Sequence, residues 1–196
     1  SFSVLAVAYT MSRLRFKLRK TFMNIAMIIG LFPGFMSMVA TYYILKAFEL
    51  TQGNMIKIGL ILVYSGGSGL GFYIAKGFFD TIPKALDEAA TIDGATRFQI
   101  FTRITIPLSK PIIVYTILTS FIGPWTDFVF AKVICRAEMD QYTVAIGMWK
   151  MLEKEYLVNW YTPFCAAAVC ISIPISILFL IMQRYYVEGM AGAVKG

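Results

Sequence analysis

Residues 88–108 read EAATIDGATRFQIFTRITIPL, a polar segment with a glycine that lies between two strongly apolar stretches. The residues that lead into it, KALDEAATI at 84–92, are good helix formers, and Pro83 suits the start of a helix. Small and apolar side chains share one side of this helix: Ala85, Leu86, Ala89 and Ala90. We therefore expect a short helix that ends in a turn at Asp93-Gly94.

A second short helix is predicted directly after this turn. Thr96 followed by Gln99 has the spacing of a capping box, in which each side chain satisfies a free backbone N–H of the other residue, and Pro107 closes the helix. Its apolar side chains recur at helical spacing: Phe98, Phe101 and Ile104. Residues 80–107 therefore predict a helix–turn–helix hairpin whose apolar and alanine-rich faces are ready to dock on another surface.

The composition is that of a protein that crosses a membrane several times. Of its 196 residues, 58% are apolar and 15% are charged, and the mean hydropathy is +0.69, far above that of ordinary soluble proteins. The net charge of +7 could indicate nucleic-acid binding, but basic residues beside apolar spans are explained more simply by their role in orienting the spans in the membrane. Histidine is absent and Cys135, Cys165 and Cys170 follow no ligand pattern, so we expect no metal site and no Cys-His catalytic pair.

Four stretches are long enough to cross a bilayer as helices. Residues 21–45, 58–75 and 156–183 carry no charge, and residues 111–131 carry only Asp127. The predicted spans are 21–46, 57–76, 111–131 and 160–184. Residues 1–12 are apolar but too short to cross, so we expect them to end a span whose beginning, with any helix before it, is missing from this chain.

Lysine and arginine residues divide unevenly between the two sets of alternating loops. The set that includes residues 76–110 and the C-terminus carries 12 of them, and the other set carries 6. Because cytoplasmic loops are enriched in Lys and Arg, we predict that the loop at 79–107 and the tail at 187–196 face the cytoplasm. The loop at 132–159 is then extracytoplasmic.

Three of the spans contain residues that can interrupt a helix. These are Gly30, Pro33 and Gly34 in the first span, SGGSGLG (65–71) in the second and Pro174 in the last. Such breaks are tolerated in lipid where neighbouring helices or a water-filled cavity satisfy the freed backbone groups. Close packing through small residues and a role in permeation both remain open for these positions.

The spacing within the hairpin resembles the EAA loop of the membrane subunits of binding-protein-dependent ABC importers. The matching positions are Glu88, Ala89, Ala90, Asp93, Gly94, Ile104, Ile106 and Pro107. In that family the loop inserts into clefts on the ATP-binding subunits and couples their closure to movement of the membrane helices. The resemblance implies that these residues contact an ATPase, whereas an ordinary amphipathic connector is the alternative.

The resemblance extends over nearly the whole chain and indicates the carbohydrate branch of the family, of the maltose/maltodextrin type. Segments such as LFPGFMSMVATYYIL (31–45) and QRYYVEGMAGAVKG (183–196) carry it. It implies one all-α permease domain over residues 1–196, with the type I ABC importer fold, in the bacterial inner (cytoplasmic) membrane. It also implies that a flexible tail reaches the ATPase pair through Gly192, Lys195 and Gly196, although a disordered terminus would have the same small residues.

The resemblance further implies that the chain helps to import an oligosaccharide and itself catalyses no reaction. Its partners would be a second homologous permease subunit, two ATP-binding subunits, an extracytoplasmic sugar-binding protein and membrane lipid. ATP and Mg²⁺ would bind the ATPase subunits, because this chain has no GxxxxGK[ST] loop to hold phosphates. No cofactor, metal or nucleic acid is expected on the chain itself.

Polar residues within the spans are candidates for a translocation path: Tyr64, Ser65, Ser68 and Asp127. Asp127 is the only acid within an apolar run, and an intramembrane acid is costly enough to indicate a function. Lys132 follows closely, so pairing or hydration near the outer surface is an equal alternative for Asp127. For Tyr64 and the two serines, the alternative is helix packing.

The extracytoplasmic loop predicts an amphipathic helix at about residues 141–154. The resemblance implies that this segment contacts the sugar-binding protein. A helix that lies on the membrane surface is the ordinary alternative.

Other functions fit parts of the same pattern. A permease for another solute, such as a different oligosaccharide or a polyol phosphate, would share every feature above. An ion-driven secondary transporter would ordinarily show intramembrane charge relays and internal repeats, and this chain offers one acid. A membrane-embedded enzyme would need a nucleophile with a base, or metal ligands, and histidine is absent.

Single-cysteine labelling tests the predicted topology. In a background without the native cysteines, we expect Ala95→Cys to react with a membrane-impermeant maleimide only after the cells are opened, because the hairpin is predicted to be cytoplasmic. Gln52→Cys, on the predicted outer side, should react in intact cells and serves as the control. Labelling of position 95 in intact cells would overturn the topology.

Overall fold

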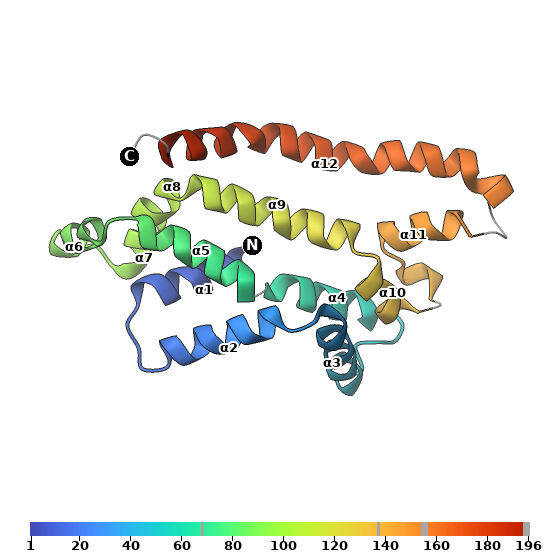
Figure 1. Cartoon of the computed structure of the whole chain (residues 1–196), viewed down its shortest axis with the longest axis horizontal. Helices are drawn as coiled ribbons and strands as arrows, with labels where there is room; N and C mark the ends of the chain where they lie inside the picture. Colours follow the sequence, from blue (N-terminus) through green and yellow to red (C-terminus); the bar gives the residue numbers. More distant parts are fainter. Residues whose placement is uncertain (68, 137, 154–156, 194–196) are drawn as a thin grey trace. The chain divides into compact units, whose positions relative to one another are not determined.

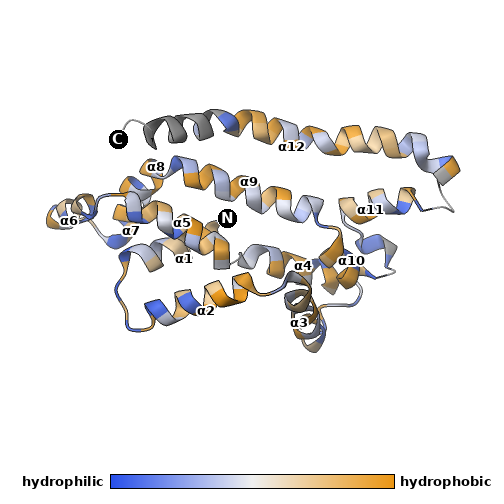
Figure 2. Cartoon of the chain, viewed as in Figure 1, coloured by the Kyte–Doolittle hydropathy of each residue, from blue (hydrophilic) through white to orange (hydrophobic). Residues whose placement is uncertain are grey.

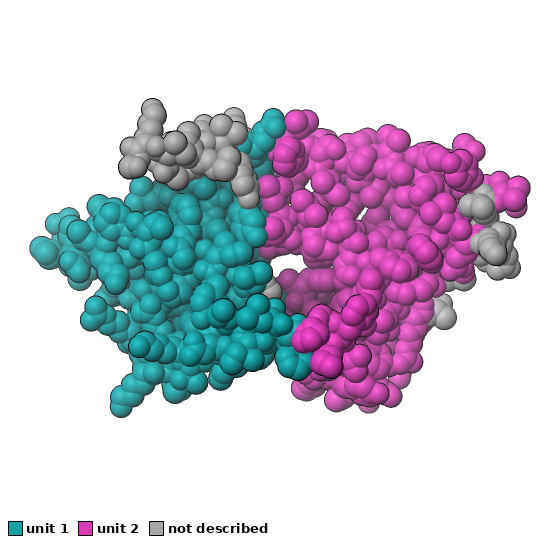
Figure 3. All heavy atoms as spheres, in the orientation of Figure 1, with its two compact units in different colours: residues 1–32, 66–117, 182–196 teal, residues 33–65, 118–181 magenta. Residues whose placement is uncertain are grey.

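The computed structural model describes residues 1–67, 69–136, 138–153 and 157–193, and Figure 1 follows the chain from end to end. The described residues form helices joined by turns and contain no strand, which confirms the predicted all-α class. They belong to two compact units (Figure 3). Unit 1 comprises residues 1–32, 66–117 and 182–196, and unit 2 comprises residues 33–65 and 118–181.

Unit 1 contains the predicted hairpin and the helices that support it. Its supporting helices are α1 (Phe2–Arg13), α2 (Arg19–Leu31) and α5 (Gly69–Thr81). The hairpin consists of α6 (Lys84–Ile92), α7 (Arg97–Ile100), the π-helix η1 (Phe101–Thr105) and α8 (Ile106–Leu108). The long helix α9 (Lys110–Thr126) starts in this unit, after a bend of 86° between Leu108 and Lys110.

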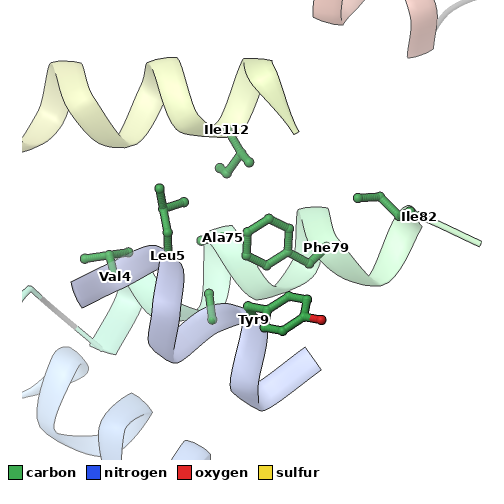
Figure 4. Close-up of a cluster of buried hydrophobic side chains, with 8 residues drawn as sticks. Val4, Leu5, Tyr9, Ala75, Phe79, Ile82 and Ile112 are labelled. Carbon is green, nitrogen blue, oxygen red and sulfur yellow. The ribbon is translucent and has the colours of Figure 1, made fainter. Parts of the chain in front are cut away.

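An apolar cluster joins α1 to α5. Its buried members are Val4, Leu5, Ala8, Tyr9, Ala75, Phe79, Ile82 and Ile112. Phe79 is fully buried, and its ring meets the ring of Tyr9 edge to face with 6.3 Å between the centroids. Figure 4 shows these two rings side by side between α1 and α5. Burial of such large apolar side chains holds the end of α1 beside the start of the hairpin.

Glycine residues allow α2 and α5 to touch backbone to backbone. A Cβ atom at Gly69 would lie 1.8 Å from the carbonyl oxygen of Ala26, which is impossible without separating the helices. A Cβ atom at Gly30 would lie 3.3 Å from the backbone nitrogen of Leu70. For these two glycines the structure therefore supports close packing, one of the two roles that the sequence left open.

Unit 2 has its own apolar core. It contains α3 (Gly34–Ala47), α4 (Met55–Gly66) except its last residue, α10 (Val129–Cys135), η2 (Met139–Gln141) and α11 (Val144–Met151). Parts of α9 and of α12 (Leu157–Ala193) complete it. The buried apolar side chains are Leu45, Ile56, Leu60, Ala131, Ile134, Cys135 and Ile146.

The predicted helix breaks occur where proline or glycine residues cluster. Helix α2 ends at Leu31 and α3 begins at Gly34, with Pro33 between them. Helix α4 ends at Gly66, and Gly67 has a φ of +77°, a left-handed value that favours glycine. A further break that the sequence did not predict lies at Asp127, between α9 and α10.

Pro174 does not interrupt its span, because α12 continues through Pro163 and Pro174. A lone proline removes one backbone donor, whereas a cluster with glycine also frees the backbone to leave the helix. Helix α12 also continues to Ala193, so most of the tail predicted at 187–196 is helical.

The apolar helices fit a membrane protein by length and composition. Among the described residues, Met55–Thr81 and Val158–Gln183 are long and apolar enough to cross a bilayer. The number rises to four if Arg19–Leu31 with Gly34–Ala47, and Arg97–Leu108 with Lys110–Thr126, each form one interrupted span. Figure 2 shows apolar residues along α2 and α12. The exact span limits and the topology remain predictions.

The loop predicted to be extracytoplasmic is less helical than the sequence indicated. The predicted helix at 141–154 is confirmed only in its centre, as α11 over Val144–Met151. The short 3₁₀ turn η2 precedes it, and residues 154–156 lie outside the described residues.

Gly69 and Gly77 offer a matched test of the α2–α5 contact, since both lie in α5. Gly69→Ala should destabilise the protein by about 1–3 kcal/mol, because the added Cβ overlaps the backbone of α2. Gly77→Ala should be neutral or slightly stabilising, because a Cβ there has nothing within 4 Å and alanine favours a helix. The midpoint of thermal unfolding in detergent measures both, and equal midpoints for the two variants would contradict the packing.

Candidate functional site

The turn of the hairpin has the bonding pattern of a Schellman motif. At the end of α6 the Ala95 N–H donates to the carbonyl of Ala90 at 2.9 Å, and the Gly94 N–H donates to the carbonyl of Thr91 at 3.1 Å. Gly94 has a φ of +81°, which confirms the predicted turn. A Cβ at Gly94 would have nothing within 4 Å. Glycine is therefore favoured at this position by the backbone conformation and not by lack of space.

The second half of the hairpin begins with the predicted capping box. The Gln99 N–H donates to Oγ1 of Thr96 at 3.3 Å, and the Thr96 N–H donates to Oε1 of Gln99 at 2.7 Å. Pro107 lies inside α8, and the helix ends at Leu108. The widened π turns of η1 directly precede this proline, which cannot donate to the carbonyl four residues earlier.

Phe98, the first residue of the predicted apolar stripe, is 74% exposed. Phe101 does pack inward, with its ring 4.5 Å from the ring of Tyr9, and Ile104 is half-buried. The most buried side chains here are Ile100 and Thr105. They are five positions apart, which is the repeat of a π-helix and not of an α-helix.

The outward face of α6 carries two alanines and an isoleucine beside one acidic side chain. Ala85, Glu88 and Ala89 are exposed on it, and Ile92 is 87% exposed. The other sequence-predicted residues also lie at or near the surface: Asp93, Gly94 and Pro107 are exposed, and Ala90 is half-buried. The hairpin therefore presents exposed alanine positions on α6 together with two large exposed apolar side chains, Ile92 in α6 and Phe98 in α7.

The inward face of α6 is held by α1 through polar contacts that the sequence did not reveal. Nε of Arg13 lies 3.1 Å from Oδ2 of Asp87, and Nη2 of Arg13 donates to the carbonyl of Ile82 at 2.9 Å. The hydroxyl of Tyr9 donates to the carbonyl of Arg97 at 3.4 Å. From the sequence, Arg13 is only one of the basic residues that predict the topology. Nothing in the sequence linked Arg13 with Asp87.

A basic cavity of about 820 Å³ lies between the end of α1, the start of α2 and α6. Its charged lining residues are Arg13, Arg15, Arg19, Lys84, Asp87, Glu88 and Arg97. The five basic residues of this lining are among the lysine and arginine residues from which the cytoplasmic position of this segment is predicted.

The candidate path residues lie partly together, in unit 2. The hydroxyl of Tyr64 donates to Oδ2 of Asp127 at 2.6 Å, and the Phe130 N–H donates to Oδ1 at 3.2 Å. Asp127 also lines a cavity of about 510 Å³. Its carboxylate is therefore paired by hydrogen bonds, while Nζ of Lys132 lies over the ring of Tyr142, 5.4 Å from its centroid.

The remaining predicted site residues make local contacts or lie outside the described residues. Ser65 is exposed and donates to the carbonyl of Leu62 at 3.0 Å. Gly192 lies near the end of α12, whereas Ser68, Lys195 and Gly196 lie outside the described residues. In the part of the chain that the structure describes, no group of three or more His, Cys, Asp or Glu side chains could hold a metal ion.

Comparisons with known proteins place the chain among transport proteins. It is 36% identical to the galactooligosaccharides transport system permease protein GanQ of Bacillus subtilis (strain 168), over 96% of this chain and 66% of that protein. It is 39% identical to the maltose/maltodextrin transport system permease protein MalG of Vibrio vulnificus (strain YJ016) and 37% identical to MalG of Escherichia coli (strain K12). Each of these two alignments covers 96% of this chain and 64% of the relative.

The chain thus spans 64 to 66% of the length of these relatives. The model of one family matches residues 3–192, which is nearly all of the chain and includes the whole hairpin. The helices that are long and apolar enough to cross a membrane, and the hairpin that resembles an EAA loop, agree with this match. The chain therefore belongs to the family of inner-membrane components of binding-protein-dependent transport systems, with the type I ABC importer transmembrane fold.

Proposed function

We propose that this chain is one membrane-spanning subunit of an ATP-driven oligosaccharide importer, and that its hairpin docks on an ATP-hydrolysing partner. The observation that carries this proposal is the outward face of α6 and α7. Ile92 and Phe98 are 87% and 74% exposed there, in a segment predicted to lie outside the bilayer. Large apolar side chains gathered on such a surface are typical of a protein interface.

The shape of the hairpin suits insertion into a cleft. Ala85 and Ala89 keep the outward face of α6 narrow, so a partner can approach its backbone closely. The Schellman turn and the capping box satisfy the helix ends without help from a partner. A preorganised element of this kind loses little conformational freedom on binding.

The other subunits and the substrate are part of the proposal. A second permease subunit, two ATP-binding subunits and an extracytoplasmic sugar-binding protein would complete the importer, with ATP and Mg²⁺ on the ATPase subunits. The names of the relatives given above describe transport of maltose/maltodextrin or of galactooligosaccharides. An oligosaccharide of one of these two kinds is the substrate that we propose, and this chain would catalyse no reaction itself.

The translocation path and the tail belong to the same proposal. Tyr64 and Asp127 meet beside a cavity in unit 2, so they could contact solute or set the break between α9 and α10. The end of α12 around Gly192, with Lys195 and Gly196, would reach the ATPase pair. For Tyr64 and Asp127 the alternative is helix packing, and for the tail it is a terminus without a partner.

Two substitutions test the hairpin. Ala89→Trp adds bulk to the narrow outward face, and Gly94→Val places a β-branched side chain at a φ of +81°, which such residues rarely adopt. We expect both to reduce ATPase co-purification and uptake at least tenfold while membrane abundance stays normal, because the hairpin lies outside the predicted spans.

Gln52→Trp, an exposed position on the predicted outer side, is the control for added bulk. Gly94→Asn controls for the loss of glycine, because asparagine tolerates the left-handed conformation. If Ala89→Trp and Gly94→Val both retain normal ATPase co-purification and uptake, the hairpin is only a connector.

A screen of solutes tests the substrate class. The complex that co-purifies with the chain is reconstituted into liposomes with its binding protein, and ATP hydrolysis is measured with maltotriose, a galactotriose and glycerol phosphate. We expect one of the two oligosaccharides to stimulate hydrolysis and to accumulate in the vesicles. Stimulation by the polyol phosphate alone would contradict the oligosaccharide proposal and leave the importer assignment intact.

A further inference from the structure

A buried ion pair connects α1 with the hairpin. Nε of Arg13 and Oδ2 of Asp87 are 3.1 Å apart, and the two side chains are only 2% and 10% exposed. Arg13 is the last residue of α1, and Asp87 lies in the first turn of α6. The pair therefore joins two helix ends that are distant in sequence.

The electrostatics of both helix ends favour this pairing. The C-terminal end of α1 carries partial negative charge from its carbonyl groups and attracts the Arg13 guanidinium. The N-terminal end of α6 carries partial positive charge and attracts the Asp87 carboxylate. Arg13 also donates through Nη2 to the carbonyl of Ile82, two residues before α6 starts, so the same guanidinium holds both the helix and the segment that leads into it.

Further contacts attach α1 to the hairpin on either side of the ion pair. Oγ of Ser12 donates to Oδ1 of Asp80 at 2.6 Å, at the end of α5. The hydroxyl of Tyr9 reaches the carbonyl of Arg97, at the start of α7. The last two turns of α1 thus contact the chain before, within and after α6.

These contacts leave the outward face of α6 free. Asp87 is 7% exposed, whereas Glu88, Ala89 and Ile92 of the same helix are exposed. A partner that moves α6 from its outward face would therefore move the Arg13–Asp87 pair, and with it α1.

We propose that Arg13 and Asp87 are positioning residues for coupling: their ion pair transmits movement of the hairpin to α1. This inference rests on the proposed function, because it assumes that an ATPase docks on the hairpin. The name clamp is used below for the Arg13–Asp87 pair. The clamp sets the position of α6 against α1, and its contribution to overall stability is secondary, because replacing a buried ion pair by apolar side chains of similar volume often costs little stability.

The test compares the loss of one charge, the loss of both charges and the exchange of the charges, in the full complex. Arg13→Met or Asp87→Leu alone leaves a buried charge without its partner and should lower the yield of folded protein. The double variant Arg13→Met/Asp87→Leu should fold with normal abundance and bind the ATPase. Uptake per ATP hydrolysed in this double variant should nevertheless fall about three- to tenfold, the range that coupling residues commonly show.

A second measurement tests, in the absence of the ATPase, whether the clamp fixes the distance between α1 and α6. Spin labels at Phe2→Cys on α1 and Ile92→Cys on α6, both exposed positions, report the distance between the two helices in the isolated chain without native cysteines. We expect a narrow distance distribution in the parent and a broad one in the double variant. The exchanged pair Arg13→Asp/Asp87→Arg should narrow it in part, because the ion pair returns but each charge opposes its helix dipole.

Lys57→Met is the control for the loss of a charge, because Lys57 is exposed in α4 and belongs to unit 2, whereas the clamp lies in unit 1. Normal uptake per ATP and a narrow distribution in the double variant would overturn the clamp. If no ATPase co-purifies with the parent complex, the proposed function fails, and the label distances still decide whether Arg13 and Asp87 position the hairpin.

Discussion

The position of the hairpin depends on the packing of α1 against α5. The hairpin follows α5 almost directly, since α5 ends at Thr81 and α6 begins at Lys84. The buried ring of Phe79 and its neighbours in the apolar cluster keep α1 alongside α5, which brings Arg13 next to Asp87. A slip of α1 by one helical turn, about 5.4 Å, would remove the guanidinium from both Asp87 and the Ile82 carbonyl.

The short helix α6 separates two kinds of contact on its two faces. Asp87 faces inward and meets a charge of the same chain, while Ala85, Ala89 and Ile92 face outward and are exposed. A period of 3.6 residues places these sets on opposite sides of a single helix. The internal contact is a charged pair, whereas the outward face carries Ala85, Ala89 and Ile92 beside the exposed Glu88. The two contacts can therefore be altered independently by substitution.

Local signals in the sequence predicted local structure well. The Thr96–Gln99 capping box, the turn at Asp93-Gly94 and the break at Pro33 each depend on neighbouring residues only, and all were confirmed. The contacts of Arg13 with Asp87 and of Tyr64 with Asp127 could not be predicted, because they depend on how distant helices pack. The burial of Ile100 and Thr105 was not predicted, because η1 changes the helical repeat and the sequence contains no clear sign of a π-helix except the proline that follows.

The contact between Gly69 and Ala26 has a mechanical consequence. The backbone of α2 occupies the place where a Cβ atom at Gly69 of α5 would lie. The two helices are therefore in direct backbone contact at this point. Rotation of α5 about its own axis would drive the neighbouring side chains of α5 into the carbonyl of Ala26. Tilting is therefore easier than twisting for this pair. A displacement that tilts α5 would therefore carry α2 with it, because the two backbones are in contact.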